Sequence, residues 1–150
     1  MEQLIITADL DDFSVGLTGK ANLNDFSGFG EAWFNLDEVT VFCKKLKQLA
    51  SEMAGTAELV GSQSKPDGSE YLETFSIRCY VLSASKLNGI IGVHVTLADY
   101  PYSDCRNNEI RKLSGELQLR NHKIEEFSGN LLKLINNSQS ETVLYGGTGI

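Results

Sequence analysis

Apolar and polar residues alternate along much of the chain, and a period of two is typical of a strand with one buried and one solvated face. Over 13–23 one face carries Phe13, Val15, Leu17, Ala21 and Leu23. The same alternation predicts strands over 3–8, 28–34, 56–62, 71–82, 89–98 and 111–119. Pro66-Asp67-Gly68 predicts a turn, because Pro presets φ and Gly accepts positive φ.

Twice the period changes to steps of three and four residues, which predicts amphipathic helices. The first helix carries Val39, Phe42, Leu46, Leu49 and Met53 on one stripe, with Asn35 as its N-cap and Gly55 at its end. The second helix, capped by Asn121, has Ile124, Phe127, Leu131, Leu134 and Ile135 on one stripe. Both stripes indicate helices that pack on an apolar surface.

These elements predict an α+β fold, a mainly antiparallel sheet of about seven strands with two amphipathic helices packed on one face. A single domain is expected over residues 1–136, followed by a flexible, glycine-rich tail over 137–150 in which 143–145 can add a short edge strand. A strand running straight into a helix recurs at 28–53 and 111–135. The recurrence fits either a duplication or two similar packing solutions.

The composition is that of an ordinary globular protein, with 41% hydrophobic and 22% charged residues. The chain shows no signal-peptide pattern and no apolar run of roughly 20 residues, so a soluble, cytoplasmic protein is expected. Twenty acidic against thirteen basic residues give a net charge of −7. This balance argues against nucleic acid as a partner and is compatible with a basic protein partner, although it also simply favours solubility.

Candidate chemistry is sparse. Gly28-Phe29-Gly30 lacks the third glycine of a dinucleotide loop, since Trp33 stands there. The histidines, His94 and His122, lie on different elements and no cysteine pair has metal-ligand spacing, so no metal site or cofactor is expected.

The cysteines are expected to be free thiols in a reducing compartment, with Cys43 and Cys79 in the core and Cys105 in a polar loop, where a thiol is most reactive. His94 with Ser114, Glu116 or Glu31 is the one constellation that could move a proton, and a solvated strand histidine is the simpler interpretation. No catalytic residues are therefore assigned.

Four side chains form the predicted partner interface: Trp33, Arg78, Tyr80 and His94. They fall on the polar face of the predicted sheet, and Trp, Tyr and Arg are the residues that anchor protein interfaces. The alternative places Trp33 in the core, because the register could slip at a bulge near Gly28 and Gly30, or beneath the C-terminal tail.

The segment Phe26–Asn35, the strand Gly89–Leu97 and the stretch Leu119–Leu132 resemble, in this order, small bacterial proteins that include the WapI-type immunity proteins. The resemblance implies a small cytoplasmic inhibitor that binds a cognate toxin domain, and it offers no catalytic residues to carry over. The first hypothesis is accordingly a non-enzymatic protein-binding domain. The alternatives are a small-ligand carrier or minor enzyme with a pocket between sheet and helices, and a homodimer that buries the polar face on itself.

Overall fold

The computed structural model describes residues 1–64, 71–99 and 106–148, so the predicted turn at 66–68 and Cys105 lie outside the described residues. Within them the chain forms eight strands, two α-helices and one short 3-10 helix. The elements are β1 (Gln3–Leu10), β2 (Ser14–Leu23), β3 (Phe26–Asn35), α1 (Leu36–Glu52), β4 (Thr56–Ser64), β5 (Tyr71–Ser83), β6 (Ile90–Ala98), η1 (Asn107–Glu109), β7 (Lys112–Arg120), α2 (Asn121–Ile135) and β8 (Glu141–Tyr145).

The strands divide into two antiparallel sheets of four, which we call sheet A and sheet B. Sheet A has the order β3-β2-β1-β8, and sheet B has the order β4-β5-β6-β7. The α+β class, with antiparallel strands and two helices, is confirmed. The prediction of one sheet of about seven strands is wrong, because alternation shows which face of a strand is buried but not which strands pair.

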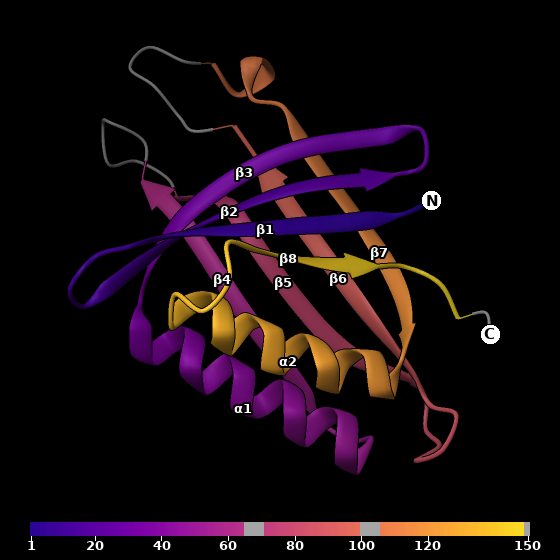
Figure 1. The fold of residues 1–150 in the computed structure, drawn as a ribbon. Helices are drawn as coiled ribbons and strands as arrows, with labels where there is room; N and C mark the ends of the chain where they lie inside the picture. Colours follow the sequence, from indigo (N-terminus) through magenta and orange to yellow (C-terminus); the bar gives the residue numbers. More distant parts are fainter. Residues whose placement is uncertain (65–70, 100–105, 149–150) are drawn as a thin grey trace.

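Sheet A lies across sheet B, so that the apolar faces of the two sheets meet (Figure 1). The two sheets approach closely at β3, where a Cβ added to Gly30 would meet the backbone of β5 and β6. The Thr74 hydroxyl of β5 also donates a hydrogen bond of 2.6 Å to the Glu31 carbonyl of β3. The absence of a side chain at Gly30 therefore permits the sheets to pack backbone to backbone.

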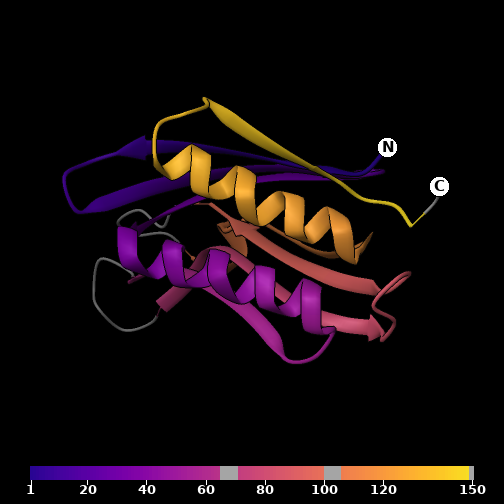
Figure 2. The same cartoon turned by 60° about the horizontal axis from the view of Figure 1, so that its bottom comes forward.

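Both helices lie on the same side of the two sheets and run in opposite directions, with α2 beside sheet A and α1 beside sheet B (Figure 2). Every residue of the two predicted stripes is buried in one common core. Phe34 of sheet A and Phe75 of sheet B meet edge to face in that core, with ring centroids 5.9 Å apart. The helices thus bury their apolar faces against both sheets at once.

The helix ends differ from the prediction by one or two residues. The backbone N–H of Asn35 donates to the Glu38 carboxylate at 3.1 Å at the start of α1, as expected for its N-cap. The helix ends earlier than Gly55, because Met53 takes a positive φ of 51° and its N–H bonds the Leu49 carbonyl. Asn121 is the first residue of α2 and not its cap, since its side-chain amide donates to the Ala50 and Lys86 carbonyls instead.

The chain contains the same unit twice, because β3–α1–β4 and β7–α2–β8 match at a constant separation of 85 residues. Identical residues at matching positions include Gly30 and Gly115, Glu31 and Glu116, Phe42 and Phe127, Leu46 and Leu131, Leu59 and Leu144, and Gly61 and Gly146. In each unit the helix leaves the last strand of one sheet and leads to the edge strand of the other. The recurrence seen in the sequence therefore extends through the strand that follows each helix.

The C-terminal segment belongs to the domain. β8 pairs with β1 from Gln3–Tyr145 to Thr7–Glu141, so the predicted tail over 137–150 contains a strand of sheet A. Beyond it the Gly147 N–H donates to the Gln118 carbonyl at 2.8 Å, and the Arg120 guanidinium donates to the Thr148 carbonyl at 3.1 Å. The short edge strand expected at 143–145 is thus present as β8, which begins two residues earlier, inside the segment expected to be a flexible tail. Neither helix is long and apolar enough to cross a membrane.

Candidate interaction surfaces

The two sheets pack by their inner faces, so their outer faces lie on opposite sides of the sandwich. Trp33 lies on the outer face of sheet A, whereas Arg78, Tyr80 and His94 lie on the outer face of sheet B. The structure therefore does not bring the four predicted interface residues together. Trp33 is 56% exposed, and the β2–β3 register runs unbroken from Ser14–Asn35 to Leu23–Phe26, so the alternative that places Trp33 in the core is wrong.

On the outer face of sheet B, Arg78 pairs with Glu73 through two hydrogen bonds of 3.0 and 2.6 Å. The Ser76 hydroxyl donates a third hydrogen bond to Glu73 at 3.0 Å. The hydrogen bonds from Arg78 are the main reason why the pKa of Glu73 lies below the usual range of a glutamate. The same bonds raise the pKa of Arg78 above the usual value of an arginine. The charges of Arg78 and Glu73 are thus paired with each other within sheet B.

A second cluster on this face joins Tyr80 to Glu116 of β7. The Tyr80 hydroxyl donates to the carboxylate at 2.5 Å, and the Gln118 amide donates to its other oxygen at 3.0 Å. Burial, followed by the hydrogen bond to Glu116, raises the pKa of Tyr80 to about 12. The hydrogen bond from Tyr80 lowers the pKa of Glu116.

His94 lies between these clusters, opposite Arg78 on one side and Glu116 on the other. Its Nε2 is 3.2 Å from the Ser114 hydroxyl. Of the three neighbours expected for His94, Ser114 and Glu116 are adjacent and Glu31 lies on the other sheet. Among the described residues no carboxylate bonds the second ring nitrogen, so a Ser-His-acid arrangement is not assembled here.

The outer face of sheet A carries exposed aromatic side chains. Trp33 lies over Gly16 of β2, where an added Cβ would be 2.9 Å from the indole. Phe29, on the same face of β3, is 54% exposed and stands opposite Lys20. All the large aromatic side chains counted as exposed among the described residues belong to sheet A or its turns: Phe13, Phe26, Phe29, Trp33 and Tyr145.

The negative charge gathers on the same half of the molecule. Residues 1–35, which form β1, β2 and β3, hold six of the acidic side chains and a single basic one, Lys20. Asp9, Glu31 and Glu141 point outward from sheet A, and no side chain of the described residues pairs with them. Residue counts in short windows of the sequence could have found this concentration, which the whole-chain charge conceals.

We call the outward-facing side of sheet A the acidic-aromatic face. Its members, with those of the adjoining turns, are Asp9, Asp11, Asp12, Phe13, Asp25, Phe29, Glu31, Trp33, Glu141 and Tyr145. It faces the viewer in Figure 1, and no described element lies in front of it. The aromatic and acidic side chains are therefore accessible together on one surface.

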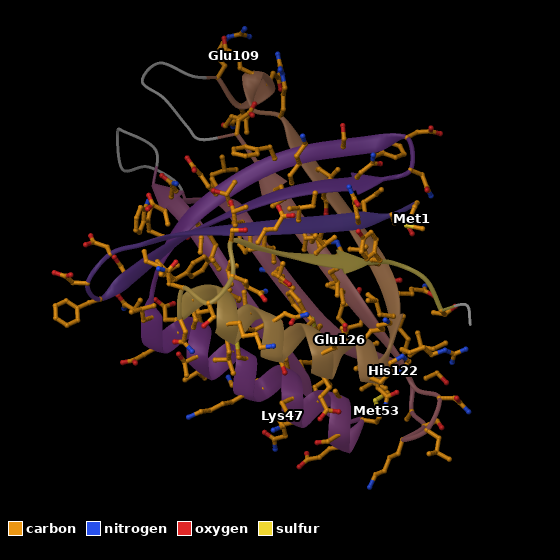
Figure 3. All side chains as sticks on the ribbon, in the orientation of Figure 1. Met1, Lys47, Met53, Glu109, His122 and Glu126 are labelled. Carbon is orange, nitrogen blue, oxygen red and sulfur yellow. The ribbon has the colours of Figure 1, made fainter. Side chains whose placement is uncertain are left out.

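The described cavities are surface grooves beside the helices. One of about 260 Å³ lies between α2 and β8, a second of about 360 Å³ lies at the C-terminal end of α1, and a third of about 380 Å³ lies between α1 and β4. The described residues include no group of three potential metal ligands. His122 stands at the start of α2 (Figure 3), whereas His94 belongs to β6. Cys43 and Cys79 are buried, which raises the pKa of each thiol to about 12.

No family model, curated protein or solved structure matches this chain.

Proposed function

We propose that this protein is a non-enzymatic binding domain that recognises a basic protein through its acidic-aromatic face. The observation that carries the proposal is the exposure of Phe29 and Trp33 among carboxylates that pair with no described side chain. Aromatic side chains on a rigid strand offer a large contact area at little entropic cost and are the usual anchors of interfaces. The surrounding carboxylates favour a cationic partner and speed its encounter.

The polar groups of sheet B support this choice of face. There Glu73 and Arg78 bond each other, and Tyr80 bonds Glu116. A partner docking on sheet B would have to desolvate or break these pairs, which costs free energy. On the acidic-aromatic face docking forms new pairs without breaking old ones.

The kind of partner follows from the resemblance to WapI-type immunity proteins. On that basis we propose a cytoplasmic immunity protein that inhibits a cognate toxin by covering its functional surface. Toxin domains that act on nucleic acid or other polyanions are basic, and an acidic surface of this kind is complementary to them. The resemblance is carried by Phe26–Asn35, which is β3, the strand that supplies Phe29 and Trp33.

The test uses the toxin-like product of a large gene neighbouring that of this protein. Its affinity for the wild-type chain is measured by calorimetry and compared with that of the double variant Phe29→Ala/Trp33→Ala. Truncating two central aromatic anchors should weaken binding at least about 100-fold. The matched control on the other sheet, Arg78→Ala/Tyr80→Phe, should change affinity less than about threefold.

Several results would contradict the proposal. Full affinity in the Phe29/Trp33 variant, with its fold verified by circular dichroism, would remove the acidic-aromatic face from the interface. A selective loss in the Arg78/Tyr80 control would move the interface to sheet B. Absence of binding at low ionic strength, together with failure of co-expression to relieve toxicity, would exclude the inhibitor role.

A further inference from the structure

A groove separate from the acidic-aromatic face runs between α1 and the edge of sheet B. It is lined by Asp37, Glu38, Val41, Glu58, Leu59 and Val60 and is a shallow, open hollow of about 380 Å³. β4 is the last strand of sheet B, and no strand of the described residues pairs with its outer edge. An unpaired strand edge presents backbone N–H and C=O groups that can accept another strand.

The walls of this groove combine apolar and acidic side chains. Val41 and Val60 are 48% and 40% exposed, so each leaves apolar surface in water. Asp37 and Glu58 make no side-chain hydrogen bond or ion pair with the described residues, whereas Glu38 accepts the Asn35 N–H. Glu58 stands opposite Arg78 in the β4–β5 register and attracts it electrostatically, although no hydrogen bond joins the two side chains. The groove therefore offers two aliphatic contacts and two carboxylates without a side-chain hydrogen bond, beside the outer edge of β4.

The repeated unit places a matching groove between α2 and β8, which is the edge strand of sheet A. The positions that correspond to Glu38, Val41, Glu58, Leu59 and Val60 are Lys123, Glu126, Val143, Leu144 and Tyr145, and all of them line it. In that groove Lys123 and Glu126 of α2 form an ion pair, with 3.7 Å between Nζ and Oε2. The groove thus recurs with the repeated unit, but of the two only the β4 groove has a net negative charge, because Lys123 balances Glu126 in the other.

We propose that the β4 groove binds an extended cationic and aliphatic segment of a partner polypeptide, which adds to β4 as a further strand. Main-chain hydrogen bonds to β4 supply affinity in this mode, and alternate side chains of the segment supply specificity. Aliphatic side chains meet Val41 and Val60, and lysine or arginine side chains meet Asp37 and Glu58. The proposal does not depend on the function proposed for sheet A, because it uses a different surface.

Charge identifies the occupant as a basic segment and not a second copy of this chain. Two copies paired through β4 would bring Glu58 of each toward the carboxylates of the other groove. Like charges placed across paired strands are unfavourable, and the chain as a whole carries a net charge of −7. A cationic segment meets no such repulsion.

The probe is a capped, fluorescein-labelled peptide of about eight residues in which pairs of valine and lysine alternate, so that each face of the added strand carries both. Binding is followed by fluorescence anisotropy at low ionic strength, and the site is located by backbone amide shifts and hydrogen exchange. Shifts and protection should centre on Thr56–Val60. A control peptide with proline in place of valine has the same charge but cannot pair as a strand, and it should not bind.

Matched charge reversals separate this groove from its counterpart. Glu58→Lys should lower the affinity for the lysine-valine peptide about tenfold. Glu126→Lys, on the exposed side of α2 in the matching groove (Figure 3), should change affinity less than about twofold. Thermal unfolding of both variants confirms that the fold is retained.

The proposal is overturned by absence of peptide binding, by equal binding of the proline peptide, or by equal effects of the two reversals. Shifts confined to β1, β2 and β3 would also overturn it, while supporting a cation-binding role for the acidic-aromatic face. If the peptide protects β4 from hydrogen exchange and the Phe29→Ala/Trp33→Ala variant binds it with unchanged affinity, the β4 groove is supported. This result holds even if the function proposed for sheet A fails its own test.

Discussion

Equivalent backbone positions of the repeated unit lie on the outer faces of the two sheets, but their side chains make different interactions. Glu31 and Glu116 occupy the same position in the repeated unit. Glu116 accepts hydrogen bonds from Tyr80 and Gln118, whereas Glu31 pairs with no side chain of the described residues. The same carboxylate is thus a structural group on one sheet and an available charge on the other.

The central strands repeat the contrast. Gly16 and Gly92 stand opposite the equivalent positions Trp33 and Gln118, and on each sheet an aromatic ring lies over the glycine. On sheet B the ring belongs to Tyr80, whose hydroxyl is tied to Glu116. On sheet A it belongs to Trp33, which is 56% exposed. In the repeated fold the aromatic side chain is therefore hydrogen-bonded within one sheet and exposed without such a bond on the other.

The largest expected effect distinguishes the two halves at their matching glycines. A Cβ at Gly30 would lie 2.9 Å from the Ala98 nitrogen and 3.1 Å from the Leu97 Cα, and backbone cannot give way. At Gly115 it would meet only the end of the Leu23 side chain, which can rotate. Gly30→Ala should cost about 3 kcal/mol or more in the free energy of unfolding, and Gly115→Ala about 1 kcal/mol. Urea denaturation measures both, and equal costs would refute the close crossing of the sheets at β3.

The second prediction concerns the ion pair of sheet B. Hydrogen bonds from Arg78 lower the pKa of Glu73 below its unfolded value near 4.5, so the stabilisation is present above that pH and is lost as the pH falls through the folded pKa. The side chains are 30% and 36% exposed, so solvent screening limits the pair to about 1 kcal/mol. Arg78→Ala should lower stability by that amount at pH 7 and by less below pH 4. Additive effects of Arg78→Ala and Glu73→Gln would contradict a direct coupling.

How far the sequence predicts this molecule depends on the range of each interaction. The helical stripes, such as Phe42–Leu46 and Phe127–Leu131, are local periodicities and were predicted correctly. The division into two sheets was not, because Trp33 and Tyr80 alternate with their neighbours in the same way although their strands pair with different partners. Pairing is a long-range choice that a period of two does not encode.

The candidate surfaces show the same limit. The exposure of Trp33 follows from the alternation within β3, whereas the proximity of His94 to Ser114 and Glu116 follows from the pairing of the consecutive strands β6 and β7. Both were among the expectations from the sequence. The separation of Trp33 from Arg78 required the sheet order. The short strand β8 lies among glycines and polar residues and completes the acidic-aromatic face only by pairing with β1.

The third prediction follows Tyr80, the group that closes the outer face of sheet B. Its pKa is raised to about 12, so the stabilisation from its hydrogen bond is present below pH 10 and is lost as the pH rises toward 12. Ultraviolet titration of tyrosinate, with the Tyr80→Phe curve subtracted, should show one tyrosine ionising near pH 12. Glu116→Gln should lower this pKa only in part, because burial is the larger cause. Ionisation of Tyr80 near pH 10 would mean that the ring is not held over Gly92.

The smallest effect on stability is expected at the carboxylates of sheet A, and it sharpens the contrast most. Asp9→Asn/Glu31→Gln removes charges that pair with no described side chain, so the free energy of unfolding should change by less than about 0.5 kcal/mol. The association rate with a basic partner should nevertheless fall several-fold and depend less on salt, because steering comes from accessible charge. Glu116→Gln, at the position equivalent to Glu31, should do the reverse: it lowers stability by weakening the charge-assisted hydrogen bond from Tyr80 and leaves the association rate nearly unchanged. Stopped-flow mixing measures the association rate of the two variants, and urea denaturation measures their free energy of unfolding. If the two variants change the free energy of unfolding and the association rate alike, the outer faces of the two sheets do not have separate structural and binding roles.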